Sequence, residues 1–234
     1  MPPNHLTPAC RRKRNAAVAT ITNTDPQYMT PEQLRLRQLI IDTADSSFRQ
    51  KGIKKVTMDE VSKNIHMSKR TLYQFFREKE ELVLACVKNN LDREQQFVTQ
   101  ISVRSANALE VILRLLEYRI QDFASASDHY LREINRYPTV AQYFKNRRAQ
   151  SMSELVDLLN IGVEQGVFVD NINFEVFSKC MGFLSDSVLQ RERGMEEFTI
   201  SDYMRHFVVT LFRGCATDKG REIIDEFCQQ NCPN

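Results

Sequence analysis

The stretch that decides the fold is TMDEVSKNIHMSKRTLYQFFREKEEL, residues 57–82. Thr57 and Glu60 have the T-x-x-E spacing of a capping box, which predicts that a helix begins there. A turn follows at His66, and Ser68 caps a second short helix. Two short helices around a tight turn, packed on the helix that precedes them, make a helix-turn-helix.

The second of these helices places cations where they do not stabilise a helix. Lys69 and Arg70 lie in its first turn, at the positive end of the helix dipole, which costs about 0.3–1 kcal/mol for each cation. The placement is useful if this end enters the major groove, where backbone N–H groups bind phosphate and Arg or Lys binds guanine. The alternative is a solvated basic face. The predicted DNA-binding residues are Thr57, Met58, Ser68, Lys69, Arg70, Thr71, Tyr73, Gln74 and Lys79.

The charge distribution is consistent with this interpretation. The whole chain of 234 residues has a net charge of +2, but residues 1–29 carry +3, residues 31–80 carry +4 and residues 81–234 carry −5. A basic front and an acidic remainder favour a polyanion as the partner of the front, although ordinary charge scatter gives the same picture.

Helical patterns fill the chain from Pro31 onward. Few Gly and Pro residues and no strand-like alternation predict an all-α protein of about nine helices. After a long helix that begins at Lys79, the expected helices cover 105–126, 128–136, 139–165, 173–191 and 199–216. The expected organisation is a disordered basic leader (1–29), a helix-turn-helix domain (30–91), a helical C-terminal domain (92–217) and a fraying tail (218–234). Met29 is interpreted as the biological start, and the alternative is a leader that acts as a DNA-binding arm.

Several functional classes are disfavoured. No stretch approaches the roughly 18 apolar residues of a membrane span. The chain has no Walker loop, H-E-x-x-H, G-x-S-x-G or G-x-G-x-x-G motif, so we expect no enzyme, no metal and no cofactor. The six scattered cysteines predict a reducing cytoplasm. Cys228 and Cys232 remain open as a redox pair or a weak metal site.

IIDTADSSF, GIKKVTMDEVSKNI, MSKRTLYQFF and KEEL, in this order and spacing, resemble the N-terminal domain of the TetR (TetR/AcrR) family of regulators. Family patterns match Thr57, Ser68, Leu72-Tyr73, Phe76 and Lys79. Three positions depart from the commonest family pattern. His66 stands where the turn usually has Gly, and Arg70 stands where Gly often follows the first basic residue of the recognition helix. Phe75 stands where Tyr is common, directly before Phe76.

The resemblance implies a transcription regulator, most often a repressor, that binds a palindromic operator as a homodimer and responds to a small effector. The effector pocket would lie in the C-terminal domain, and the last two long helices would form the dimer interface. Core packing is the alternative for every residue in both sets. A rival function is a protein-interaction module that no longer binds DNA. Candidate pocket residues are Tyr118, Phe123, His129, Tyr130, Met152, Phe183 and Asp186. Candidate interface residues are Phe174, Phe177, Met181, Leu184, Val188, Tyr203, Phe207, Leu211 and Phe212.

Overall fold

The computed structural model describes residues 26–189, 194–195 and 197–231. These residues are helical almost throughout and contain no strand, which confirms the all-α prediction. The chain divides into two compact units, one up to Asn89 and one from Asn90 onward, here called the N-terminal and C-terminal units. The elements are η1 (Pro26–Tyr28), α2 (Pro31–Lys51), α3 (Met58–Asn64), α4 (Lys69–Phe75), α5 (Lys79–Arg104), α6 (Ala108–Ala124), α7 (Asp128–Ile134), α8 (Pro138–Glu164), α9 (Phe174–Leu189), α10 (Ile200–Asp202), η2 (Tyr203–Val208), α11 (Val209–Cys215) and α12 (Asp218–Asn231).

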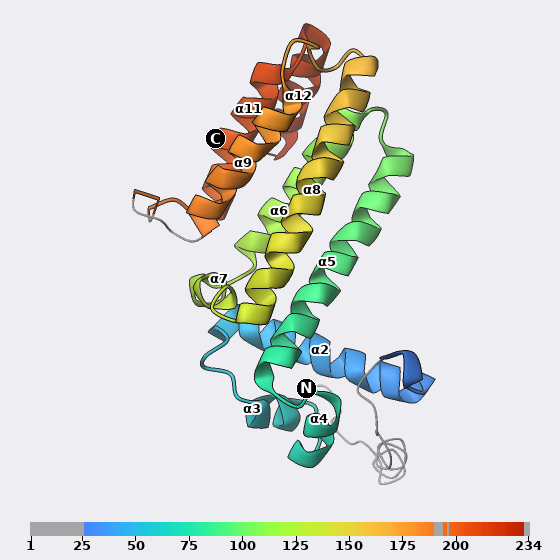
Figure 1. Cartoon of the computed structure of the whole chain (residues 1–234), viewed down its shortest axis with the longest axis vertical. Coiled ribbons are helices and arrows are strands. Elements are labelled where there is room, and N and C mark those ends of the chain that lie inside the picture. The colour runs from blue at the N-terminus through green and yellow to red at the C-terminus, as the bar shows by residue number, and fades with distance from the viewer. Residues whose placement is uncertain (1–25, 190–193, 196, 232–234) are drawn as a thin grey trace. The chain divides into compact units, whose positions relative to one another are not determined.

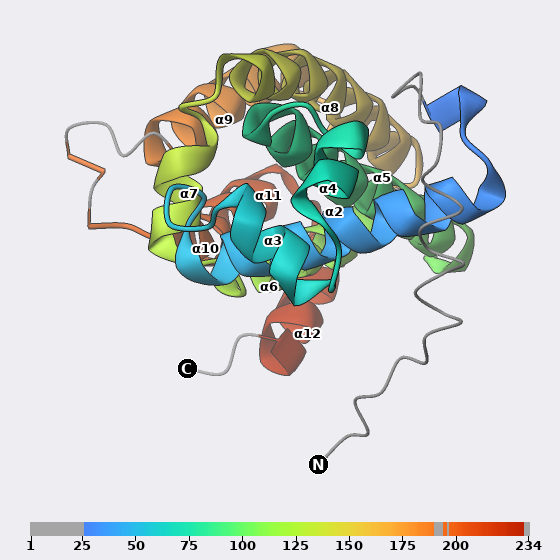
Figure 2. The same cartoon turned by 90° about the horizontal axis from the view of Figure 1, so that it is seen from below.

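The N-terminal unit is built on α2. Thr30 and Gln33 form a reciprocal capping box at its start, and Gly52, with a φ of 87°, ends it. With a ψ of 152°, this backbone conformation leaves the helix, and glycine adopts such a positive φ without a steric penalty. Ile40 and Phe48 on the buried face of α2 are almost fully enclosed. Helices α3 and α4 lie side by side beneath α2, as both views show (Figures 1 and 2).

The C-terminal unit is a helical bundle. Helices α6, α8, α9 and α11 run lengthwise beside one another (Figure 1). Their apolar stripes meet in one core, which includes Leu109 and Leu113 of α6, Leu159 of α8 and Phe212 of α11. Fully burying each such side chain contributes roughly 1.5–3 kcal/mol.

The sequence predicts one helix over 199–216, and the structure interrupts it. A π-helical stretch, η2, lies between α10 and α11, so the backbone widens there without leaving the helix. The Tyr203 hydroxyl of η2 donates a hydrogen bond to the Met181 carbonyl of α9 at 3.1 Å. This bond ties the two final bundle helices together inside the unit.

The last segment differs from the expected fraying tail. Asp218–Asn231 forms α12, because Ile224 and Phe227 lie on one face of this otherwise polar helix and pack on the core. Gly220 allows the contact, since a Cβ at this position would collide with the backbone oxygen of Val167. The polar average of the segment conceals an apolar stripe that is only one helix face wide.

Other expectations concern residues that the structure does not describe. The basic run of the leader and Cys232 lie outside the described residues, whereas Cys228 is half-buried beside the C-terminal core. Within the described part of the chain, no helix is both long and apolar enough to span a bilayer.

Candidate nucleic-acid interface

The turn between α3 and α4 is set by backbone hydrogen bonds. The Met67 amide donates to the Ser62 carbonyl at 2.8 Å, and the His66 amide donates to the Lys63 carbonyl at 3.0 Å. This pair of bonds is a Schellman motif, whose central residue must be left-handed. His66 has a φ of 52° and is the one non-glycine residue with a positive φ in the described chain. The turn therefore keeps the geometry of a glycine turn without glycine.

The N-terminus of α3 is capped by Thr57. Its hydroxyl accepts a hydrogen bond from the Glu60 amide at 3.1 Å. The expected capping box is only half formed, because the Glu60 carboxylate pairs with the Lys51 ammonium at 2.5 Å instead. This hydrogen bond holds the pKa of Glu60 below its usual value. The Met58 side chain is buried, so only the backbone N–H of this residue can meet phosphate.

The recognition helix α4 begins in the same way. The Ser68 hydroxyl accepts from the Thr71 amide at 3.1 Å and lies 2.8 Å from the Thr71 hydroxyl. Leu72 and Phe75 anchor the helix through their fully buried side chains. The polar face of α4 is consequently held outward by the apolar face beneath it.

Among the predicted DNA-binding residues of α4, exposure differs. Arg70 is exposed, and the Tyr73 ring is 45% exposed. Lys69 is exposed but forms an ion pair with Asp59 of α3. Gln74 is half-buried and its side-chain oxygen is enclosed without a hydrogen-bond partner in the protein. The structure therefore presents Arg70 and Tyr73 directly, while Lys69 must exchange its carboxylate partner to bind a phosphate.

Lys79, another of the predicted DNA-binding residues, also has a protein contact. Its Nζ lies 5.8 Å from the centre of the Phe48 ring, and the Arg37 guanidinium lies 5.0 Å from the Phe76 ring. Both cations cover the apolar core of the N-terminal unit. Burial lowers the pKa of Arg37.

The C-terminal unit contains an open pocket of about 770 Å³ between α8 and α9. Three predicted effector residues, Met152, Phe183 and Asp186, line it. The other candidates lie elsewhere in the unit: Tyr118 stacks on Phe97 beside a smaller pocket, Phe123 packs on the core, His129 is exposed and Tyr130 is buried.

The candidate interface residues also separate by burial. Phe207 is 38% exposed. Five others are buried within the unit: Phe174, Met181, Val188, Tyr203 and Phe212. Three are partly buried: Phe177, Leu184 and Leu211. Sequence reasoning missed Val176 and Cys180, which are exposed on α9 at helical spacing from Phe183.

A family model described as "Bacterial regulatory proteins, tetR family" matches residues 40–86. The HTH-type transcriptional repressor KstR2 of Mycobacterium tuberculosis is 24% identical over 146 residues, which cover 58% of this chain and 71% of that protein. The uncharacterized HTH-type transcriptional regulator YhgD of Bacillus subtilis is 48% identical over 46 residues, which cover 20% of this chain and 24% of that protein.

Solved structures share the fold. A transcriptional regulator from Cytophaga hutchinsonii has a TM-score of 0.59 at 20% identity, and the match covers 82% of this chain and 96% of that one. A transcriptional regulator from Saccharomonospora viridis, solved in complex with choline, has a TM-score of 0.58 at 19% identity and covers 85% and 98%. At such identities the likeness concerns the fold alone.

Proposed function

Because this chain belongs to the TetR family of bacterial regulatory proteins, we propose that it represses transcription as a homodimer bound to a palindromic operator. That it is a DNA-binding transcriptional regulator follows from the family. The two-fold dimer on a palindrome, repression as opposed to activation, and the response to an effector are the proposal. A regulator of this kind acts where the chromosome is, so the proposal includes a cytoplasmic location.

One observation carries the DNA-binding part of the proposal. The α4 N-terminus is exposed together with Arg70 and Tyr73, while Leu72 and Phe75 fix the helix from behind. A helix held in this way can insert its first turns into the major groove, where Arg reads guanine. The capped N-terminus of α3 at Thr57 offers a hydroxyl and backbone N–H groups to phosphate, which positions the helix without reading sequence.

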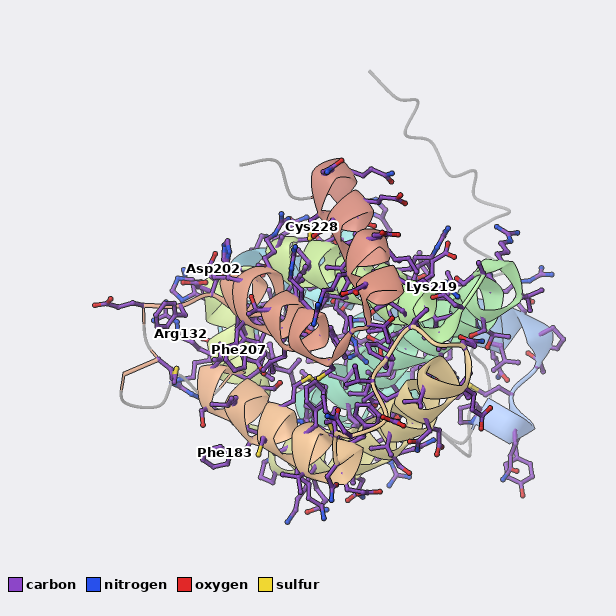
Figure 3. The ribbon with its side chains drawn as sticks, turned by 90° about the horizontal axis from the view of Figure 1, so that it is seen from above. Arg132, Phe183, Asp202, Phe207, Lys219 and Cys228 are labelled. Carbon is purple, nitrogen blue, oxygen red and sulfur yellow. The ribbon has the colours of Figure 1, made fainter. Side chains whose placement is uncertain are left out.

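The homodimer is supported by an exposed apolar stripe on α9. Val176, Cys180 and Phe183 recur at helical spacing, and Phe183 is 68% exposed. Figure 3 shows Phe183 projecting outward from α9, and Phe207 lies on the same side of the unit. Exposed aromatic groups of this size are typical of protein interfaces. A two-fold dimer through this surface would match the two-fold symmetry of a palindrome.

Sedimentation of the full chain tests the dimer. Phe183→Glu places a charge in the proposed interface, so we expect this variant to sediment as a monomer while the unchanged chain sediments as a dimer. Val103→Glu is the matched control, because Val103 is also an exposed apolar residue but lies on another helix, α5. A dimer that withstands Phe183→Glu would contradict this interface.

The effector part of the proposal rests on the pocket between α8 and α9. A ligand that binds one conformation of the C-terminal unit better than another shifts the population toward it, and repression ends if that conformation fits the operator poorly. The pocket residues Met152 and Asp186 are the proposed contacts.

Selection of binding sites from a random DNA library tests the proposed function. We expect enriched sites with two inverted half-sites whose centres lie about one helical turn, or a multiple of it, apart. The variant Arg70→Ala/Tyr73→Ala should lose the enrichment and keep its circular dichroism spectrum. One observation favours an interaction module that does not bind DNA: Lys69 already forms an ion pair with Asp59 inside the protein. A folded chain that enriches no site would support this alternative.

A further inference from the structure

The pocket of the C-terminal unit is a groove between two helix faces. Residues at helical spacing on α8, from Ala141 to Ser153, form one wall, and residues from Glu175 to Asp186 on α9 form the other. Twelve helical steps make the groove about 18 Å long. Its volume of about 770 Å³ suits a small-molecule ligand.

The middle of the groove is apolar. Phe144 and Met152 of α8 face Phe183 and Gly182 of α9. A Cβ at Gly182 would lie 3.5 Å from the Met152 sulfur, which is an ordinary van der Waals distance between the two helix faces. An extended hydrocarbon segment would find its contacts along this surface.

The charges in the groove are unequal. Lys145, Arg148 and Lys179 supply three positive charges, and Glu175 and Asp186 supply two negative charges, which leaves the lining at +1. Arg148 of α8 pairs with Asp186 of α9 and so bridges the groove. Arg148 is half-buried, and burial lowers the pKa of its guanidinium. A partly desolvated guanidinium strongly favours an anionic partner.

We propose that this groove binds an amphipathic monoanion, whose apolar chain lies along Phe144 and Met152 and whose anionic head displaces Asp186 from Arg148. The inference rests on the proposed effector role of the C-terminal unit and names the chemical class of the effector. Lys145, one helical turn from Arg148, adds a second cation for the head. Displacing Asp186 removes a tie between α8 and α9, which gives the ligand a different affinity for the tied and untied arrangements of these helices.

Calorimetric titration of the full chain with three probes of equal chain length tests the charge preference. The probes are decanoate, decan-1-ol and decyltrimethylammonium, each below its micelle concentration. A charged hydrogen bond predicts that decanoate binds about ten- to hundred-fold more tightly than decan-1-ol. We expect the cation to bind most weakly. Equal affinity for decanoate and decan-1-ol would overturn the proposal.

Two variants of opposite sign locate the head group. Arg148→Met should weaken decanoate binding about ten- to hundred-fold, because it removes the charged donor. Asp186→Asn should strengthen it, because the ligand no longer competes with a carboxylate. The matched control is Arg147→Met, since Arg147 neighbours Arg148 on α8 but pairs with Glu154 instead of lining the groove. If Arg148→Met does not fold, Asp186→Asn alone decides, and weaker binding by this variant would overturn the proposal.

Failure of this inference is distinguishable from failure of the proposed function. The titrations contain no DNA, so they report on the groove alone. If DNA binding is sequence-specific but the probes bind without charge discrimination, the ligand class is wrong and the regulator stands. If decanoate binds with the predicted variant pattern and the chain enriches no DNA site, the groove assignment stands and the regulator does not.

Discussion

His66 is the position where the structure makes its sharpest stability prediction. The residue sits at φ 52° at the centre of the Schellman turn between α3 and α4, and its side chain is exposed. A left-handed conformation costs an L-residue about 1–2 kcal/mol, and His belongs to the types that tolerate it better than most. Glycine escapes this cost but loses about 0.5–1 kcal/mol more backbone entropy on folding. His66→Gly should therefore raise the free energy of unfolding of the N-terminal unit by about 0.5–1 kcal/mol.

The companion variant His66→Ala separates backbone strain from side-chain loss. Alanine removes the imidazole and keeps the Cβ, so we expect its free energy of unfolding to equal that of the unchanged chain or to fall slightly below it. Hydrogen exchange of the Met67 amide is a local assay, because this amide donates to the Ser62 carbonyl inside the same turn. Where exchange follows cooperative opening, glycine should slow it roughly two- to five-fold. If the glycine variant exchanges as fast as the alanine variant, the turn is not left-handed in solution.

Three further results are expected. Asp59→Asn frees Lys69 from its ion pair, so DNA affinity should rise up to about five-fold at low salt and lose this gain at high salt. Fluorescence anisotropy measures the affinity, and weaker DNA binding by the variant would contradict the pairing. Gly220→Ala forces a Cβ onto a backbone carbonyl and should lower the free energy of unfolding in urea by about 1–3 kcal/mol. Gly182→Ala makes only an ordinary contact and should not destabilise the protein. Equal effects of the two variants would refute the close approach at Gly220. Burial raises the pKa of the Cys86 thiol, so this cysteine should resist iodoacetamide at pH 8. The exposed Cys180 thiol should react in the monomeric Phe183→Glu variant. Peptide mass spectrometry identifies the modified cysteine, and modification of Cys86 instead of Cys180 would contradict the burial.

Local signals in the sequence predicted the helix-turn-helix well. Thr57 and Ser68 cap helices through bonds to residues three positions onward, and such bonds depend on the neighbouring chain alone. The left-handed turn at His66 is equally local, because its hydrogen bonds close within six residues. A pattern of cap, turn and cap therefore carries nearly all the information that this part of the fold needs.

The sequence did not predict which side chains pair across neighbouring helices. Glu60 leaves its predicted capping partner for Lys51, and Lys69 finds Asp59, because both pairs depend on how neighbouring helices cross. The pair with Asp59 also gives Lys69, a cation at a helix N-terminus, a structural role besides DNA binding.

The C-terminal unit shows the same limit more strongly. An apolar residue such as Met181 or Val188 fits an internal core and a dimer interface equally well by periodicity, and the structure places both in the core. Helix α12 escaped detection because its stripe is narrow and its mean hydropathy is low. The π-helical stretch η2 follows from packing and has no signal of its own in the sequence.

The most direct test of the account is the salt dependence of binding to DNA from upstream of the gene that encodes this chain, with random DNA as competitor. We predict preferential binding to the upstream DNA, with an affinity that falls steeply between about 50 and 200 mM salt. Arg70→Ala should weaken specific binding by about 1–3 kcal/mol and leave random-DNA binding less affected. Equal affinity for both DNAs, unchanged by Arg70→Ala at any salt concentration, would contradict recognition of an operator through α4.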